Sequence, residues 1–185
     1  MFRFIKRVIA FFLTLAVLAG IGRYVVVPRV IPLEYTDIVE KYAEEFDLEE
    51  SLIYAVIFCE SRFDAEVVSH AGAVGLMQVT ADTGMWVAKH IGMDPNAIDL
   101  TDPDTNVHLG CWYLNWLDDR FHGQTLTALA AYNAGHTNVE NWLSDEEKSF
   151  DGISLDQIPF PETDKYVSRV EFMEEVYIRL YHLGE

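Results

Sequence analysis

The sequence predicts a mainly α-helical domain that contains an irregular loop and little or no sheet. Apolar residues recur at helical spacing through most of the chain, and no long stretch alternates apolar and polar residues as a half-buried strand does. Hydrophobic residues make up 50% of the 185 residues and aromatic residues 13%, which is enough apolar surface for a core without disulfides. The length favours one domain rather than two.

The chain begins with a segment that is typical of a membrane anchor. Residues 8–27 are almost entirely apolar, and they follow the basic residues Arg3, Lys6 and Arg7. About 20 such residues can cross a bilayer core, with the preceding positive charges held in the cytoplasm. We therefore expect residues 1–27 to form a single-pass anchor in the cell membrane.

A cleaved signal peptide is the alternative to a retained anchor. Ala19 followed by Gly20 offers the small residues that signal peptidases need, and the chain would then be secreted. In both interpretations the proline-punctuated linker 28–34 and the domain 35–185 lie outside the cytoplasm.

Seven helices are expected after the linker. They are predicted at about 35–46, 47–63, 81–91, 103–121, 124–133, 137–143 and 162–183. Asp47 and Glu50 resemble a capping box at the start of the second helix, and Pro103 suits the first turn of the fourth. Residues 64–79 are rich in glycine, alanine and serine and predict an irregular loop, whereas 144–161 predict an acidic surface loop.

The distribution of charge excludes one class of partner. All 30 acidic residues follow Pro28, where only nine basic residues remain, so residues 28–185 carry a formal charge of −21. So acidic a domain repels a phosphate backbone, and nucleic acid is not expected as a partner. An uncharged or mixed-charge polymer such as a glycan remains compatible.

The cysteines and histidines do not form a metal-ligand pattern. Cys59 and Cys111 lie in apolar helical contexts, which favours small buried hydrophobic residues; a disulfide between them is the alternative in an oxidising compartment. The six histidines are scattered, without the spacing of a zinc site. Neither a metal nor a cofactor is expected.

Glu60 is the first candidate for chemistry. It lies four residues after Val56 and three after Ile57, so its carboxylate falls on the buried face of its own helix. Burial disfavours the charged form, and this is how a carboxyl group stays protonated near neutral pH and acts as a general acid. The alternative is a structural ion pair, for example with Arg62.

Two further runs carry candidate binding residues. Gly72 and Gly75 allow a tight backbone before Gln78, whose amide suits sugar hydroxyl and acetamido groups. Tyr132 supplies an aromatic face and a hydroxyl, and Asn133 follows it near a helix end. Taken singly, a structural turn, core packing and helix capping explain these residues equally well.

Together these runs resemble the soluble lytic murein transglycosylase domain family of the lysozyme-like superfamily. The similarity rests on ESRF at 60–63, GAVGLMQ at 72–78, AYNAG at 131–135 and ETDKYV at 162–167, in the family's order and spacing. It extends over about residues 34–180. The resemblance implies a lysozyme-like helical domain whose irregular loop lines the active site.

The resemblance also implies an activity. Glu60 would be the single acid/base that cleaves the MurNAc-β-1,4-GlcNAc bond of peptidoglycan strands, leaving 1,6-anhydro-MurNAc ends. The residues it assigns to substrate binding are Ser69, Met77, Gln78, Tyr132, Asn133 and Tyr166. Thr80 and Ala81 stand where the family often has Met-Pro, which removes one expected substrate contact. The sequence names no partner in the wall or secretion machinery.

Two other functions stay open. Goose-type lysozymes resemble parts of the same motifs but hydrolyse the bond, and they would need a further carboxylate; Asp64 and Glu66 are the acidic residues between Glu60 and Gly75. Asp64 follows the predicted helix end, where a loop role is expected. A non-catalytic wall-binding domain is the second alternative, although it would have no reason to keep a buried acid at Glu60.

Overall fold

The computed structural model describes residues 2–22 and 26–184. The chain divides into two units, Met1–Glu34 and Tyr35–Glu185, and each unit is described by itself.

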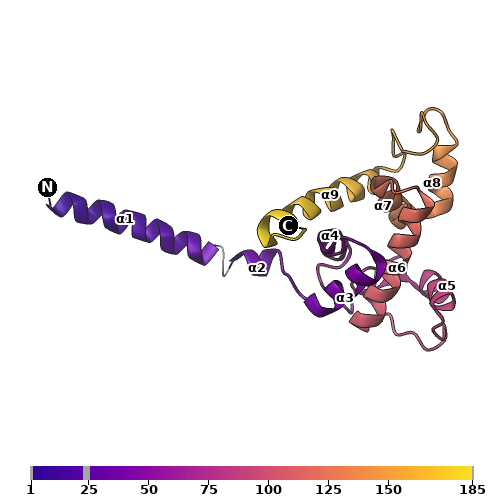
Figure 1. Cartoon of the computed structure of the whole chain (residues 1–185), viewed down its shortest axis with the longest axis horizontal. Coiled ribbons are helices and arrows are strands. Elements are labelled where there is room, and N and C mark those ends of the chain that lie inside the picture. Colours follow the sequence, from indigo (N-terminus) through magenta and orange to yellow (C-terminus); the bar gives the residue numbers. More distant parts are fainter. Residues whose placement is uncertain (1, 23–25, 185) are drawn as a thin grey trace. The chain divides into compact units, whose positions relative to one another are not determined.

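The N-terminal unit contains two helices, α1 (Phe2–Ile21) and α2 (Val27–Val30) (Figure 1). Residues 23–25, which belong to the predicted membrane segment, lie outside the described residues. Among the helices of the described residues, none combines the length and the apolar character that crossing a membrane requires.

The C-terminal unit is built from helices, with one short antiparallel hairpin between α4 and α5 (Figure 1). Its elements are α3 (Thr36–Phe46), α4 (Glu50–Glu60), β1 (Ala73–Val74), β2 (Val79–Thr80), α5 (Ala81–Ile91), α6 (Pro103–Arg120), α7 (Thr125–Ala134), α8 (His136–Leu143) and α9 (Pro161–Tyr181). In the hairpin Ala73 pairs with Thr80 and Val74 with Val79. The predicted fold class, mainly helical with almost no sheet, is confirmed.

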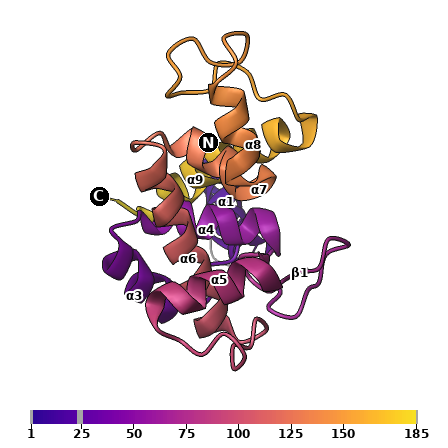
Figure 2. The ribbon, with the colours of Figure 1, turned by 90° about the vertical axis from the view of Figure 1, so that its right-hand side faces the viewer.

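Helix α4 forms the centre of the core. Residues 51–57 are buried without interruption, so this helix is covered on all sides rather than along one stripe. It packs most extensively against α9 and also contacts α3, and Figure 2 shows it in the middle of the unit. A side chain at the C-terminal end of α4 therefore emerges directly from the core.

The predicted capping box at the start of α4 was wrong. Asp47 instead ends α3 in the left-handed conformation, with φ 53°, and its N–H donates to the Ala43 carbonyl. Glu49 occupies the N-cap of α4 without a side-chain hydrogen bond. The sharp reversal between two packed helices requires a left-handed residue there, and aspartate tolerates that conformation better than most residues do.

Helix α4 also ends three residues earlier than predicted. Arg62 and Phe63 have φ of 54° and 68°, which no helix accommodates. The Ser61 hydroxyl lies 3.2 Å from the Ile57 carbonyl oxygen, to which it donates, and it accepts the Phe63 N–H at 3.1 Å. Glu60 is thus the last helical residue, and the chain turns immediately after it.

The buried amide of Asn106 holds the loop that follows β1. Its Oδ1 accepts the Met77 N–H at 2.8 Å, while its Nδ2 donates to the carbonyls of Val74 and Leu100, both at 2.8 Å. Gly75 has φ +80°, and a Cβ there would lie 2.4 Å from the Leu100 oxygen. The loop can approach α6 this closely only because residue 75 has no side chain.

We predict that Asn106→Ala destabilises the domain by about 2–4 kcal/mol, because it leaves one buried N–H and two carbonyls without their partner. Denaturant unfolding of both proteins measures this difference. The exposed Asn141 of α8 offers a matched control, since Asn141→Ala should change stability by no more than about 0.5 kcal/mol. Equal effects of the two substitutions would contradict the role given to Asn106.

Candidate active site

Glu60 lies where α4 leaves the core. The residue as a whole is partly exposed, but its carboxyl lies among enough protein atoms that desolvation raises the pKa to about 7, from an ordinary value of 4.5. The Tyr166 hydroxyl and the positive charge of Arg169 offset part of this rise. The carboxyl is therefore protonated in a large fraction of molecules at neutral pH, as a general acid must be.

Helix α9 supplies both groups that moderate the acid. Tyr166 and Arg169 are three residues apart and so lie on one face of the helix. Arg169 Nη2 also donates to the Cys59 carbonyl at 3.3 Å, which holds the guanidinium beside the end of α4. Sequence analysis missed Arg169, although its spacing from Tyr166 was a usable signal.

The Tyr166 hydroxyl is an unusual group within the described residues. It is buried, and it makes no hydrogen bond of normal geometry with any of the described residues. It nevertheless lies close enough to lower the pKa of Glu60, while burial, with a further contribution from Glu60, raises the pKa of Tyr166 itself. Since an unmade buried hydrogen bond is costly, this hydroxyl is available to the Glu60 carboxylate after the carboxyl loses its proton.

Tyr132 connects the acid to the loop. Its hydroxyl donates to the Met77 carbonyl at 2.8 Å, and burial together with the nearby Glu60 raises its pKa. Asn133, next along α7, is exposed, and its Oδ1 accepts the Thr163 hydroxyl at 2.9 Å. The two neighbouring residues thus fasten the end of α7 to the loop and to the start of α9.

The polar candidates of the loop also shape it. Ser69 Oγ accepts the Ala73 N–H at 3.0 Å, and Ser69 N–H donates to the Ala73 carbonyl at 2.9 Å. Gln78 Nε2 donates to the carbonyls of Val67, at 3.2 Å, and Gly75, at 3.0 Å. Both side chains remain partly exposed, so a ligand can still reach them.

Met77, which the sequence placed among the substrate-binding residues, lies in the core. Its side chain is fully buried, 3.8 Å from the sulfur of Cys111. Gly110 makes room for it, because a Cβ at that position would lie 2.5 Å from the Met77 sulfur. Met77 therefore anchors the loop in the core, and only its backbone faces the site, through Tyr132.

Arg62, Asp64 and the two cysteines each had an alternative role in the sequence interpretation. Arg62 is exposed and lies over the Phe58 ring at 5.9 Å, and it is not among the groups that shift the pKa of Glu60. Asp64 accepts the Glu66 N–H at 3.0 Å, the loop role that was expected.

Both cysteines are free thiols, Cys111 fully buried and Cys59 partly exposed. Among the described residues no cluster could hold a metal ion.

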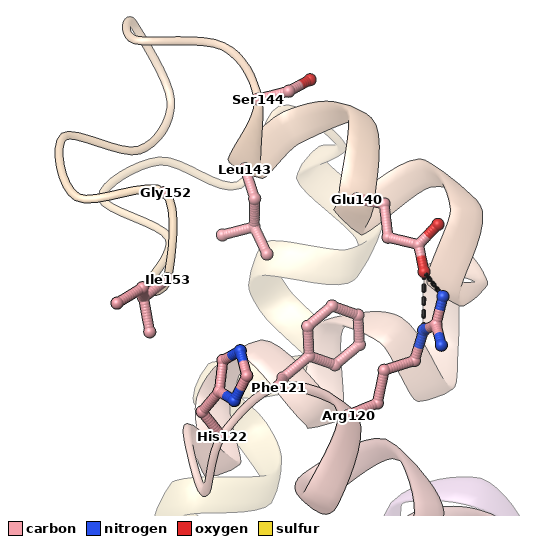
Figure 3. Close-up of a pocket in the computed structure, with 8 residues that line it drawn as sticks. All are labelled: Arg120, Phe121, His122, Glu140, Leu143, Ser144, Gly152 and Ile153. Atoms are coloured by element: carbon pink, nitrogen blue, oxygen red, sulfur yellow. Dashed lines mark hydrogen bonds and ion pairs between the residues drawn. The ribbon is translucent and has the colours of Figure 1, made fainter.

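A separate pocket lies between the end of α6, α8 and the loop after α8 (Figure 3). Arg120 and Glu140, its two charged residues of opposite sign, are paired with each other, with Arg120 Nε 2.6 Å from the glutamate oxygen. None of the motif residues lines this pocket. We therefore place the candidate active site at Glu60 and not here.

A helical core that ends in one partly protonated carboxyl, beside a glycine-containing loop, agrees with the lysozyme-like domain that the motifs predict. Residues 37–152 match the model of the family described as "Transglycosylase SLT domain", and the chain belongs to this family.

Relatives and solved structures are similar over most of the chain. The soluble lytic murein transglycosylase of Escherichia coli K12 is 32% identical over 83% of this chain and 24% of its own length. The membrane-bound lytic murein transglycosylase C of Sodalis glossinidius is 30% identical over 79% of this chain and 47% of its own. The chain thus spans about a quarter of the first relative and about half of the second.

The solved structures that are similar to this chain belong to the same kind of protein as the relatives. A structure of an inactive mutant of the lytic transglycosylase Slt from Pseudomonas aeruginosa superposes with a TM-score of 0.73 at 30% identity, covering 84% of this chain and 26% of that one. The 70 kDa soluble lytic transglycosylase of E. coli gives 0.72 at 28% identity, with the same coverage. The resemblance inferred from the motifs is confirmed.

We predict that Glu60→Gln stabilises the domain, and more so as pH rises. The pKa of Glu60 is about 7 in the folded protein and 4.5 in its ordinary, unfolded state, so above pH 4.5 the folded protein keeps a proton that the unfolded chain releases. The contribution of this residue to the free energy of unfolding therefore falls as pH rises from 4.5 through about 7. The amide avoids that loss. Between about pH 5 and about pH 8 its advantage should grow by roughly 2 kcal/mol.

Denaturant unfolding at the two pH values measures this difference. The exposed Glu147 provides the control, because Glu147→Gln should show no growing advantage. A pH-independent effect at Glu60 would mean that its carboxyl is not desolvated.

Proposed function

We propose that this protein is a peptidoglycan lytic transglycosylase that cleaves the MurNAc-β-1,4-GlcNAc bond without water. The observation that carries the proposal is the single carboxyl of Glu60, with a pKa near 7 at the end of a buried helix. Family membership and the names of the relatives support the substrate class. One of the similar structures is of a mutant, described as inactive, in which a glutamate is replaced by glutamine.

Glu60 acts twice in the proposed reaction. Its proton goes to the glycosidic oxygen as the bond from C1 of MurNAc to that oxygen breaks, and GlcNAc leaves with a free hydroxyl. The acetamido oxygen of MurNAc bonds to C1 and gives an oxazolinium. The Glu60 carboxylate then takes the proton of the C6 hydroxyl, whose oxygen displaces the acetamido oxygen from C1. The product is a 1,6-anhydro end, and the acid has its proton back.

The surrounding residues have supporting parts. The Tyr166 hydroxyl and the Arg169 charge favour the ionised Glu60 that exists between the two steps. Ser69 orients the acetamido group, Gln78 takes sugar hydroxyl or acetamido groups, and Tyr132 keeps the loop at the correct distance from the acid. We assign Asn133 to the same binding surface, since its side chain is exposed beside Tyr132.

Hydrolysis with a second carboxylate is the competing mechanism. Retaining glycosidases place their two carboxyl groups about 5–5.5 Å apart, and at that distance each strongly shifts the pKa of the other. In the described chain the only charge that shifts the pKa of Glu60 is Arg169, so no carboxylate acts at that range. Asp64, the nearest candidate in sequence, is engaged in its loop. This electrostatic isolation argues against a retaining pair of carboxyl groups and supports assistance by the acetamido group of the substrate.

We also propose that residues 1–27 anchor the enzyme in the cell membrane by a single pass, with the domain outside the cytoplasm. The apolar stretch 8–27 and the basic residues before it support this orientation. Some relatives of this chain are named membrane-bound. Release by signal-peptide cleavage near Ala19 remains the alternative.

We predict that Glu60→Gln abolishes the release of anhydro ends while keeping the fold, because the amide has no transferable proton. Asp64→Asn is the matched control and should retain turnover, since Asp64 only shapes its loop. Mass spectrometry of products from purified peptidoglycan measures both effects. Reducing ends instead of anhydro ends, or a collapse of activity in the folded Asp64 variant, would favour the hydrolase.

A further prediction concerns topology. Protease added to intact cells from which the wall has been stripped should digest the domain, because residues 28–185 face outward. A cytoplasmic protein serves as the control for cell integrity. Digestion that occurs only after lysis would show that the orientation is wrong, and a protein found in the medium without its first residues would favour signal-peptide cleavage.

A further inference from the structure

A series of ring contacts connects the candidate active site to the start of α8. The ring of Tyr132, whose pKa is raised in part by the nearby Glu60, lies 5.6 Å from the ring of Tyr113. Tyr113 stacks on Trp116 at 5.9 Å, and Trp116 contacts the ring of His136 at 5.4 Å. The first residue of α8 is therefore joined to the site through direct contacts.

A second contact between α6 and α8 lies one helical turn further on, at the pocket drawn in Figure 3. Here Arg120 Nε lies 2.6 Å from a carboxylate oxygen of Glu140, and the guanidinium also lies over the Trp116 ring at 5.1 Å. This ion pair lines the pocket, which extends to Leu143, the last residue of α8. Since α8 has eight residues at 1.5 Å each, the pocket lies about 10 Å beyond His136.

The pocket has a volume of about 410 Å³ and a mainly apolar wall. Phe121 comes from the end of α6, Leu143 from α8 and Ile153 from the loop after α8. Phe121 is only 4% exposed, so the pocket has no open aromatic face on which a sugar ring could stack. Its shape and its apolar wall suit aliphatic groups with charged ends instead.

The ion pair leaves both signs of charge available to a ligand. Among the described residues it uses Nε and Nη2 of Arg120 and a single oxygen of Glu140. The guanidinium Nη1 and the second carboxylate oxygen remain, and the two side chains are 42% and 39% exposed. A ligand with a carboxylate and an ammonium can therefore make charge-assisted hydrogen bonds to both residues.

The stem peptide of a muramoyl unit has this combination of groups. It carries free carboxylates, the amino group of a diamino acid and the methyl groups of its alanines, whereas a sugar unit without a peptide has no charge for the ion pair. Residues 28–185 have a formal charge of −21, which repels carboxylates in general. A site for this peptide on such a domain needs a cation, and Arg120 provides it.

We propose that the pocket of Figure 3 receives the stem peptide of a muramoyl unit, with a peptide carboxylate at Arg120 and the ammonium of the diamino acid at Glu140. The proposal rests on the proposed function, since it assumes that the glycan strand passes Glu60. Four residues of extended peptide span about 13 Å, which is enough to reach the pocket from the start of α8. The pocket then makes the enzyme select strands that still carry their peptides.

The test compares two probes that differ only in the peptide. The full chain carrying Glu60→Gln is titrated calorimetrically with a peptidoglycan tetrasaccharide bearing tetrapeptides of the diaminopimelate type, and with the same tetrasaccharide after an amidase has removed them. We expect the peptide-bearing form to bind roughly tenfold more tightly, which corresponds to about 1.4 kcal/mol. Electrostatic repulsion by the acidic domain alone would give the opposite order.

Two substitutions then locate the peptide. Ile153→Asp, at a position that is 44% exposed, and Arg120→Gln should each lower the preference to about twofold or less, because they remove the apolar wall or the cation. Any effect of Arg120→Gln on the sugar site through Trp116 changes both titrations and cancels in their ratio. Phe150, on the same loop and 93% exposed, does not line the pocket, so Phe150→Ala is the matched control and should keep the preference.

The outcomes separate the two proposals. Equal binding of the two probes by the parent, or a preference that persists in both pocket variants, overturns the peptide site. If Ile153→Asp does not fold, Arg120→Gln decides. Anhydro ends released by the wild type support the proposed function whatever the pocket binds, whereas a peptide preference without anhydro ends supports the pocket and contradicts the proposed function.

Discussion

The carboxyl of Glu60 loses most of its contact with water because the helix that carries it is buried over residues 51–57, and the arrangement of the site follows from that burial. A desolvated acid needs groups that stabilise its ionised form when it gives up its proton. Helix α9 provides them with the Tyr166 hydroxyl and the Arg169 charge, so the most extensive helix contact in the domain is also the one that moderates the acid. Packing and chemistry therefore depend on the same two helices.

The loop opposite the acid owes its position to α6. Two hydrogen bonds with the buried amide of Asn106 hold it there, a third joins that amide to the Leu100 carbonyl, and the missing side chain of Gly75 allows the approach. Met77 then fills the space above Gly110, and its carbonyl accepts the Tyr132 hydroxyl. The result is a rigid connection from the core to the edge of the site, which is what a reaction that depends on sugar orientation requires.

The strongly acidic character of the domain limits which groups of the wall it can bind. Residues 28–185 carry a formal charge of −21, which weakens any binding that depends on the negative groups of the wall. Stacking of neutral sugar rings on aromatic side chains does not depend on charge.

The sequence by itself determined the helical fold class, the position of Glu60 on a buried helix face and the family, because helical periodicity and ordered motifs are local properties of the chain. It placed most helix ends within one or two residues, but it misplaced the start of α4 at Asp47 and its end at Phe63. Only the tertiary structure decided which groups surround the acid and that Met77 is buried. These contacts join residues far apart in sequence, and periodicity in one helix shows which face is buried but not what buries it.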